Sequence, residues 1–269
     1  NAGGAFSPFG DITTLMVWQK GILPFTTFFK IFFPSLVNYL IPAFFMAMAV
    51  EKGQPAAQEE SVQIKTGGLI VIGLFLLTIA TAVIGHNSFH LPPTFGMMTG
   101  LAYLQFFGYY LRMKKRENPQ GDVQSYDVFE RVSRAEWDTL LFFYGIILCV
   151  GGLAVLGYLD QTSKVIYLQW GEGLSEAMKQ TPANVVVGIL SAIVDNIPVM
   201  LAVLTMMPAM SEGQWLLVTL TAGVGGSMLS IGSAAGVALM GQARGHYTFF
   251  SHLKWTWAIA LGYFASIAA

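Results

Sequence analysis

The sequence predicts an all-α integral membrane protein. Of its 269 residues, 54% are apolar and only 11% are charged, whereas about a quarter of the residues in a soluble domain are charged. The mean hydropathy is +0.59, and several apolar stretches approach the roughly 20 residues that a helix needs to cross a bilayer. These values exclude a disordered chain and an ordinary soluble enzyme. The net charge of −1 leaves no basic surface for nucleic acid.

Eight apolar segments are candidates for elements within the membrane. Five are uninterrupted and predict transmembrane helices: Pro34–Val50, Thr66–His86, Phe95–Leu111, Thr139–Asp160 and Trp255–Ala269. Three are broken by Gly, Pro or polar residues: Asn1–Trp18, Pro182–Pro208 and Trp215–Gln242. The longest polar stretch, Arg112–Asp138, opens with a basic cluster and is predicted to be cytoplasmic, because cytoplasmic loops carry an excess of Lys and Arg. It separates residues 1–111 from residues 139–269.

The same charge rule bears on the topology of the broken segment Pro182–Pro208. If this segment crosses the membrane, eight of the 14 Lys and Arg residues lie inside; if it enters and returns on the outer side, ten do. The positive-inside bias therefore favours a re-entrant hairpin at 182–208. The preference depends on two residues, Arg244 and Lys254.

Asp195 lies at the midpoint of this segment in either topology. An ionised carboxylate at membrane depth costs about 3 kcal/mol and implies a partner or a water-filled cavity. Pro198 removes a backbone donor and breaks the helix close by, and broken backbone at this depth is tolerated only where it lines protein or a cavity. We therefore disfavour the alternative in which Asp195 is only a hydrogen-bonded helix cap.

The first and last broken segments share one pattern. Each has a glycine pair, five residues, a third glycine and then a polar residue: Gly3-Gly4, Gly10 and Asp11 in one copy, Gly225-Gly226, Gly232 and Ser233 in the other. On the predicted topology the first copy runs from inside to outside and the second from outside to inside. This is an inverted repeat, the arrangement common in secondary transporters, whose discontinuous helices expose backbone near the middle of the bilayer.

Hydroxyl side chains gather at both breaks: Ser7, Thr13 and Thr14 in the first, Ser227, Ser230 and Ser233 in the second. Oxygen ligands combined with a carboxylate suit a hard cation such as Na⁺. For each hydroxyl the alternative is that it only joins neighbouring helices. The four histidines show no metal-binding spacing, and His246 and His252 are interpreted as interfacial residues.

Three strings carry a family resemblance: NAGGAFSPFGDITT at residues 1–14, VDNIPV at 194–199 and GVGGSMLSIGSAAG at 223–236. They resemble the NhaD-type sodium/proton antiporters of the ion-transporter superfamily, and the likeness includes QARGHYTFF at 242–250. The resemblance implies that Asp195 and Asn196 lie at the tip of the hairpin 182–208, and that 1–18 and 215–242 are discontinuous helices. The ion-site residues it implies are Asn1, Asp11, Thr13, Thr14, Ser191, Asp195, Asn196, Ser230 and Ser233. The first hairpin of that superfamily has no counterpart here, so we expect that an N-terminal portion is missing and is needed for a full site.

The expected chemistry is competition of Na⁺ and H⁺ for one carboxylate site, with Asp195 as the principal ligand and Asp11 as the second. Burial favours the protonated form of a carboxylate, and a bound cation favours the ionised form. The resemblance implies exchange of Na⁺ or Li⁺ for H⁺ in a bacterial inner membrane, without a cofactor. The expected surroundings are membrane lipid, and a homodimer is possible.

Two alternatives remain open. A dicarboxylate or citrate symporter shares the broken-helix plan, but the acidic hairpin tip would repel an organic anion. A non-transporting scaffold subunit would have little reason to retain two acids at membrane depth. An enzyme is not expected, because the sequence offers no nucleophile–base pair or metal triad at that depth.

Overall fold

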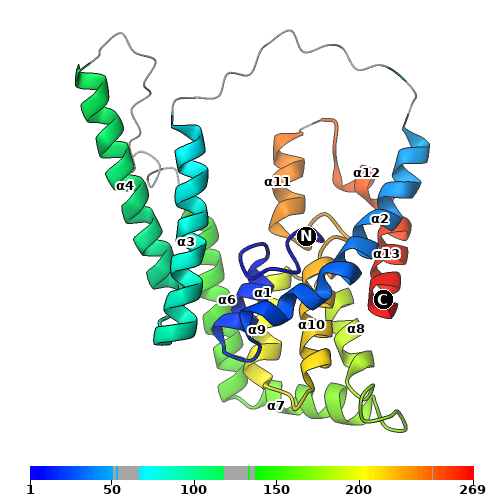
Figure 1. Cartoon of the computed structure of the whole chain (residues 1–269). Helices are drawn as coiled ribbons and strands as arrows, with labels where there is room; N and C mark the ends of the chain where they lie inside the picture. The colour runs from blue at the N-terminus through cyan, green and yellow to red at the C-terminus, as the bar shows by residue number, and fades with distance from the viewer. Residues whose placement is uncertain (51–52, 54–66, 118–132, 134–136, 244) are drawn as a thin grey trace. The chain divides into compact units, whose positions relative to one another are not determined.

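The computed structural model describes residues 1–50, 53, 67–117, 133, 137–243 and 245–269 (Figure 1). These residues form helices, turns and loops, with no strand among them, which confirms the all-α fold class. They divide into two compact units, residues 1–51 with 140–269, and residues 52–139. Most of the predicted cytoplasmic loop at 112–138, and Arg244, lie outside the described residues.

The unit of residues 52–139 contains two long helices, α3 (Gly68–Phe89) and α4 (Pro93–Glu117). Their backbones approach closely through glycines of α4. A Cβ added to Gly96 would lie 2.3 Å from the Cα of Ala82, and one added to Gly100 would lie 2.2 Å from the side chain of Thr78. Small residues four positions apart commonly bring membrane helices together in this way.

By length and hydropathy, two helical stretches of the described chain could each cross a membrane: Phe25–Ala49 and Gly68–Phe89. α4 is not one of them, although its 25 residues would be long enough. Leu140–Val155 and Tyr158–Gln169 qualify as a third span only when taken together, and they are bent by 78°.

This bend corrects the predicted uninterrupted span Thr139–Asp160. Helix α6 (Trp137–Val155) ends before α7 (Tyr158–Ser163), which continues as the π-helix η2 (Lys164–Gln169). Gly157 lies at the bend with φ of 78°, a left-handed conformation that glycine adopts without strain. Residues 139–160 are apolar throughout, so their composition gives no sign of a bend that depends on one residue.

In the other unit, α2 (Phe32–Ala49) and α13 (Thr256–Ala268) pack against each other. The ring centroids of Phe45 and Trp257 are 5.0 Å apart, and a Cβ on Gly262 would lie 2.7 Å from the carbonyl oxygen of Asn38. Residue numbers therefore rise along α2 as they fall along α13, so the two helices are antiparallel. Each follows one of the broken segments, so their opposed directions are those that an inverted repeat requires.

The segment predicted as a hairpin contains two short helices, α8 (Thr181–Leu190) and α9 (Asn196–Met206), joined by a turn at 191–195. At 1.5 Å per residue each is about 15–17 Å long, half the thickness of the hydrocarbon core. Gln180 Nε2, just before α8, donates to the carbonyl of Ala209, just after α9 (3.2 Å). The chain thus returns to the end from which it started. That both ends lie on one side of a membrane stays a prediction.

Buried polar contacts fix α8 to α10 (Glu212–Gly225), which runs beside it. The Asn184 side chain has no exposed surface, and its Nδ2 donates to Gln214 Oε1 (2.7 Å) and lies 3.2 Å from the Gln214 carbonyl. Further along α10, Thr221 Oγ1 donates to the Asn184 carbonyl (2.8 Å). The hairpin is therefore held by side chains of the following helix.

The two remaining broken segments are interrupted in similar ways. Glu212–Gly225 is followed by an irregular stretch at 226–233 and then by α11 (Ala234–Gln242). At the start of the chain, residues 1–11 form turns and α1 (Ile12–Gln19) follows. We call residues 1–11 the first break and residues 226–233 the second break. Short helices, η1 (Phe25–Ile31) and α12 (Phe249–Leu253), precede α2 and α13.

Candidate functional site

Both breaks are closed by the same contact between two glycines. A Cβ on Gly4 would lie 2.2 Å from the carbonyl oxygen of Gly10, and one on Gly226 would lie 2.3 Å from that of Gly232. No side chain fits at such distances, so the repeated glycine spacing has a direct structural cause: the unwound backbone crosses itself closely in each copy. The crossing leaves short stretches of backbone outside regular helix.

Polar side chains cap the helices that begin at the breaks and at the hairpin turn. Asp11 Oδ1 accepts a hydrogen bond from Thr13 N (3.1 Å) at the start of α1. Asp195 Oδ1 accepts from Ile197 N (3.0 Å) at the start of α9, and Ser233 caps α11. Asp195 therefore does act as a helix cap through Oδ1, which is the alternative that the sequence analysis disfavoured. Capping leaves the second oxygen of each carboxylate available.

Asp11 and Thr13 each direct a buried oxygen towards the backbone of α10. Asp11 Oδ2 and Thr13 Oγ1 are buried, and neither has a hydrogen-bond partner elsewhere in the described chain. A Cβ on Gly223 would lie 2.9 Å from the first and 3.3 Å from the second, so both oxygens converge on one place where α10 has no side chain. Buried polar atoms are nearly always satisfied. A hydrogen bond from the Thr13 hydroxyl to the Asp11 carboxylate would satisfy these oxygens, and so would a small cation bound between them.

No described ion pair involves these carboxylates. The ion pairs among the described residues are Lys30–Glu212, Lys164–Asp160 and Lys179–Glu176. Asp11 and Asp195 are absent from this set, and both side chains are half-buried. Neither carboxylate forms an ion pair with a described basic residue, and neither is fully open to solvent.

Two of the predicted hydroxyl ligands hold the backbone together. Thr14 Oγ1 donates to the carbonyl of Ala5 within the first break (2.8 Å). Ser191 Oγ lies 2.8 Å from the carbonyl of Gly188 and 2.9 Å from that of Ala222, so it links the hairpin turn to the end of α10. A hydroxyl that donates its proton retains lone pairs for a cation. Structural and ligand roles are compatible at both positions.

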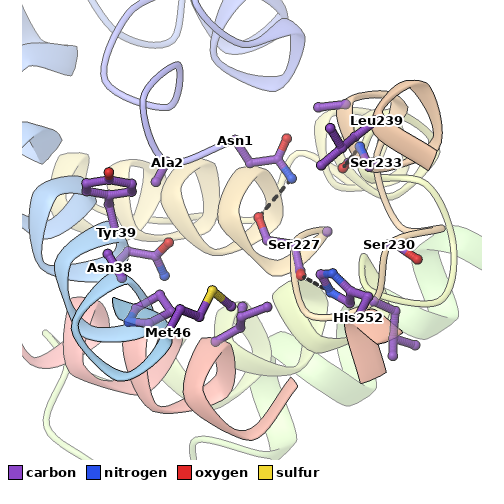
Figure 2. Close-up of a pocket in the computed structure, with 17 residues that line it drawn as sticks. Asn1, Ala2, Asn38, Tyr39, Met46, Ser227, Ser230, Ser233, Leu239 and His252 are labelled. Carbon is purple, nitrogen blue, oxygen red and sulfur yellow. Dashed lines mark hydrogen bonds between the residues drawn. The ribbon is translucent and has the colours of Figure 1, made fainter. Parts of the chain in front are cut away.

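A cavity of about 470 Å³ lies between the second break, α2 and α11 (Figure 2). Three of the predicted site residues line it: Asn1, Ser230 and Ser233. Asn1 Nδ2 donates to Ser227 Oγ (2.9 Å), which joins the first break to the second, as the dashed line in Figure 2 shows. The structure therefore brings residues from the two repeats, more than 200 positions apart, to one cavity.

Other predicted site residues are not joined to this group. Asn196 is buried, with 5% of its surface exposed, and it begins α9 next to Asp195. Among the described contacts, no hydrogen bond or ion pair joins Asp195 or Asn196 to Asp11. Helix α1 does pack against α9 and α10, so the hairpin and the first break are neighbours.

Four polar residues of the cavity were not among the predicted site residues: Asn38, Tyr39, Ser227 and His252. His252 is buried, with its Nε2 3.0 Å from the carbonyl of Ser227 and 3.3 Å from that of Met228. Its position at the membrane interface stays a prediction. Asn38, in the middle of α2, has a buried Nδ2 without a hydrogen-bond partner in the described chain. A lone amide within an apolar span was a visible signal for Asn38, but nothing local in the sequence marked His252.

Comparison with known proteins identifies relatives of the whole chain. The protein named Na(+)/H(+) antiporter NhaD of Alkalimonas amylolytica is 60% identical over 100% of this chain and 58% of its own length. The protein of the same name from Vibrio parahaemolyticus is 60% identical over 98% of this chain and 66% of its own. Sodium/proton antiporter 1 of Arabidopsis thaliana is 33% identical over 100% of this chain and 46% of its own.

These relatives confirm the resemblance to NhaD-type antiporters. The chain spans less than two thirds of the length of each of them. No solved structure matches it. A family model described as Citrate transporter matches residues 1–223, which is most of the sequence. The chain therefore belongs to the citrate transporter family of membrane proteins.

Proposed function

We propose that the protein containing this chain is a secondary active transporter that exchanges Na⁺ or Li⁺ for H⁺, with the two ions competing for carboxylates within the membrane. The names of the relatives support the exchange of sodium for protons. The observation that carries the proposal is the convergence of Asp11 Oδ2 and Thr13 Oγ1, buried and unpartnered, beside Gly223.

In the proposed mechanism the two oxygens of Asp11 have separate tasks. Oδ1 stays bound to the N-terminus of α1 as its cap, and Oδ2 takes either a proton or the cation. When Oδ2 is protonated, the site is neutral and cannot hold Na⁺; when it is ionised, Na⁺ binds between Oδ2 and the Thr13 hydroxyl. The positive end of the α1 dipole stabilises the ionised form. Without a cation, a buried carboxylate would otherwise have nothing to stabilise its charge.

The two ion gradients are coupled if the empty, charged site does not reorient across the membrane. Each transport cycle then carries either a cation or a proton through the site, and one gradient drives the other. The half-buried carboxylate of Asp195, at the hairpin turn, is the second proton and cation ligand. We thus reverse the order expected from the sequence, because Asp11 rather than Asp195 has the buried, unpartnered oxygen.

The experiment measures Na⁺-dependent collapse of ΔpH in everted membrane vesicles that contain the full-length protein. Asp11→Asn retains an oxygen that can cap α1 and removes the charge. A hydrogen bond or ion contact to a charged group contributes about 1.5–3 kcal/mol, so we expect the apparent Na⁺ affinity to fall by at least about tenfold. Asp195→Asn is expected to weaken it less.

The matched control is Asp160→Asn, because the Asp160 side chain is 68% exposed and paired with Lys164, four residues later. This variant should retain wild-type exchange. Undiminished ΔpH collapse in both Asp11→Asn and Asp195→Asn would contradict competition at these carboxylates.

One observation favours a second function: the matching family model is described as a citrate transporter. A citrate symporter must bind substrate carboxylates, and helix N-termini are suitable places for anions. Here the N-termini of α1 and α9 are already occupied by Asp11 and Asp195, which would repel an organic anion. Uptake of labelled citrate into liposomes driven by Na⁺, without Na⁺/H⁺ exchange, would establish the second function instead.

If the reconstituted full-length protein transports neither ion nor citrate, the scaffold alternative holds. We place the protein in a bacterial inner membrane, because several of its relatives are bacterial antiporters. The large apolar side chains exposed on α3, such as Leu69 (72%) and Phe75 (62%), suit contact with lipid. A homodimer stays a prediction.

A further inference from the structure

We propose that His252 is a positioning residue for ion transport, in that its imidazole fixes the unwound backbone of the second break. The inference rests on the proposed function, because it assigns to this residue an effect on cation affinity. His252 belongs to α12, outside both breaks and the hairpin. Its Nε2, however, contacts the second break, 25 residues earlier in the chain.

The imidazole holds two successive carbonyl groups of the second break. His252 Nε2 lies 3.0 Å from the carbonyl oxygen of Ser227 and 3.3 Å from that of Met228. Thr256, four residues after His252, donates its hydroxyl to the same Met228 carbonyl (2.9 Å). Residues at the junction of α12 and α13 therefore supply the donors that this unwound stretch lacks.

The chemistry of these partners fixes the orientation of the ring and places a proton on Nε2. Carbonyl oxygens only accept hydrogen bonds, so Nε2 carries the proton. The other ring nitrogen, Nδ1, forms a hydrogen bond with the hydroxyl of Tyr247, which is both donor and acceptor. The ring is thus held from both sides, and only 9% of the residue is exposed.

The position of the second break decides where its hydroxyls lie. Ser230 and Ser233 follow the two held carbonyls and line the same cavity as His252 (Figure 2). Ligand groups act only when they are held within about 0.5 Å of the productive geometry by surrounding contacts. Loss of the imidazole would free the Ser227 carbonyl and let the loop shift, which moves these hydroxyls out of place.

The test compares three variants of the full-length protein in everted vesicles: His252→Ala, His252→Gln and His246→Ala. Glutamine offers an amide N–H that can donate to the same carbonyls. His246 is the matched control, because it lies six residues earlier and is exposed. For each variant, the KM for Na⁺ and the maximal rate of ΔpH collapse are measured at equal amounts of protein in the membrane.

We expect His252→Ala to raise the KM for Na⁺ by about tenfold, because it removes one well-placed hydrogen-bond donor. The maximal rate should change by less than about threefold. His252→Gln should restore most of the affinity, and His246→Ala should match wild type. An unchanged KM in His252→Ala, or a KM in His252→Gln raised as much as in His252→Ala, would overturn the inference.

Two further results separate the possible failures. If wild-type vesicles show no Na⁺-dependent signal, the proposed function itself fails and the inference fails with it. If His252→Ala does not accumulate in the membrane, Tyr247→Phe takes its place. This variant keeps the imidazole of His252 and removes only the tyrosine hydroxyl that is hydrogen-bonded to its Nδ1. A KM raised by about two- to fivefold in Tyr247→Phe supports the inference, and a wild-type KM overturns it.

Discussion

The first break and the second break share their glycine crossing and their polar helix cap, but they satisfy their carbonyl groups differently. In the first break the residue after the glycine pair is Ala5, and its carbonyl accepts from Thr14, ten residues after Gly4 and within the same segment. In the second break the equivalent carbonyl belongs to Ser227, and ten residues after Gly226 the chain has Gly236. With no side chain there, the donor comes from His252 instead.

The helices that follow the breaks differ in how deeply they are buried. Helix α1 buries four residues and packs against α9 and α10. Helix α11 has no buried residue. The first break is therefore closed by its own helix and carries the half-buried carboxylate of Asp11, whereas the second is held by residues from α12 and α13 and carries a serine at the equivalent cap. The same glycine pattern thus occurs in a first break that is closed by its own helix and in a second break that is held by other helices.

Alanine substitutions at the glycine crossings should produce the largest difference in stability between the two breaks. Gly4→Ala places a methyl group 2.2 Å from a backbone carbonyl of Gly10, and forcing an extra carbon into a packed site costs typically 1–3 kcal/mol, occasionally more. We expect Gly4→Ala to be the more destabilising, because buried α1 cannot move aside, and Gly226→Ala to be tolerated better beside exposed α11. Thermal unfolding of the purified full-length protein in detergent measures both.

Gly3→Ala is the control for this pair, since nothing lies within 4 Å of a Cβ at Gly3. Its unfolding temperature should equal that of wild type. If Gly4→Ala unfolds at the same temperature as Gly3→Ala, the close crossing does not exist in the protein.

A smaller effect is expected when the internal donor of the first break is removed. Thr14→Val keeps the shape of the side chain and leaves the buried Ala5 carbonyl without a partner, which costs about 1–3 kcal/mol. Thr14→Ser keeps the hydroxyl and should recover most of that stability. Equal unfolding temperatures for the valine and serine variants would show that the hydroxyl does not close the break.

The smallest effect concerns the surface contact between η1 and α10. Lys30 Nζ is 2.6 Å from Glu212 Oε1, but the two side chains are 66% and 50% exposed. An exposed ion pair contributes about 0–1 kcal/mol, so Lys30→Ala should shift the unfolding temperature little, and less at high salt. A loss as large as that of Thr14→Val would mean that this contact, rather than the internal donor, holds the first repeat.

Much of the backbone plan could be predicted, because it depends on local rules. The glycine spacing at Gly4 and Gly10 marked a broken segment, and Pro198 marked the break near the hairpin turn. The acids Asp11 and Asp195 stood out against an apolar background, and the structure shows each at a helix start beside broken backbone. Such signals need only neighbouring residues.

The rest depended on contacts between distant segments. His252 resembled any interfacial histidine until its partners, the carbonyls of 227 and 228, were placed beside it. The convergence of Asp11 and Thr13 on Gly223 likewise requires α1 to pack on α10. The bend at Gly157 left no mark in hydropathy, because one residue with positive φ changes direction without changing composition.

The buried amide contact between Asn184 and Gln214 has a consequence for the order in which the protein folds. Gln214 lies 30 residues beyond Asn184, so the buried Nδ2 of Asn184 in α8 gains its partner only when α10 packs beside α8. Helices α8 and α9 are each about half as long as a bilayer-crossing helix, and burial of an unpaired amide is costly. We therefore expect the hairpin to reach its final packing only once α10 is in place, which makes it a late step of folding.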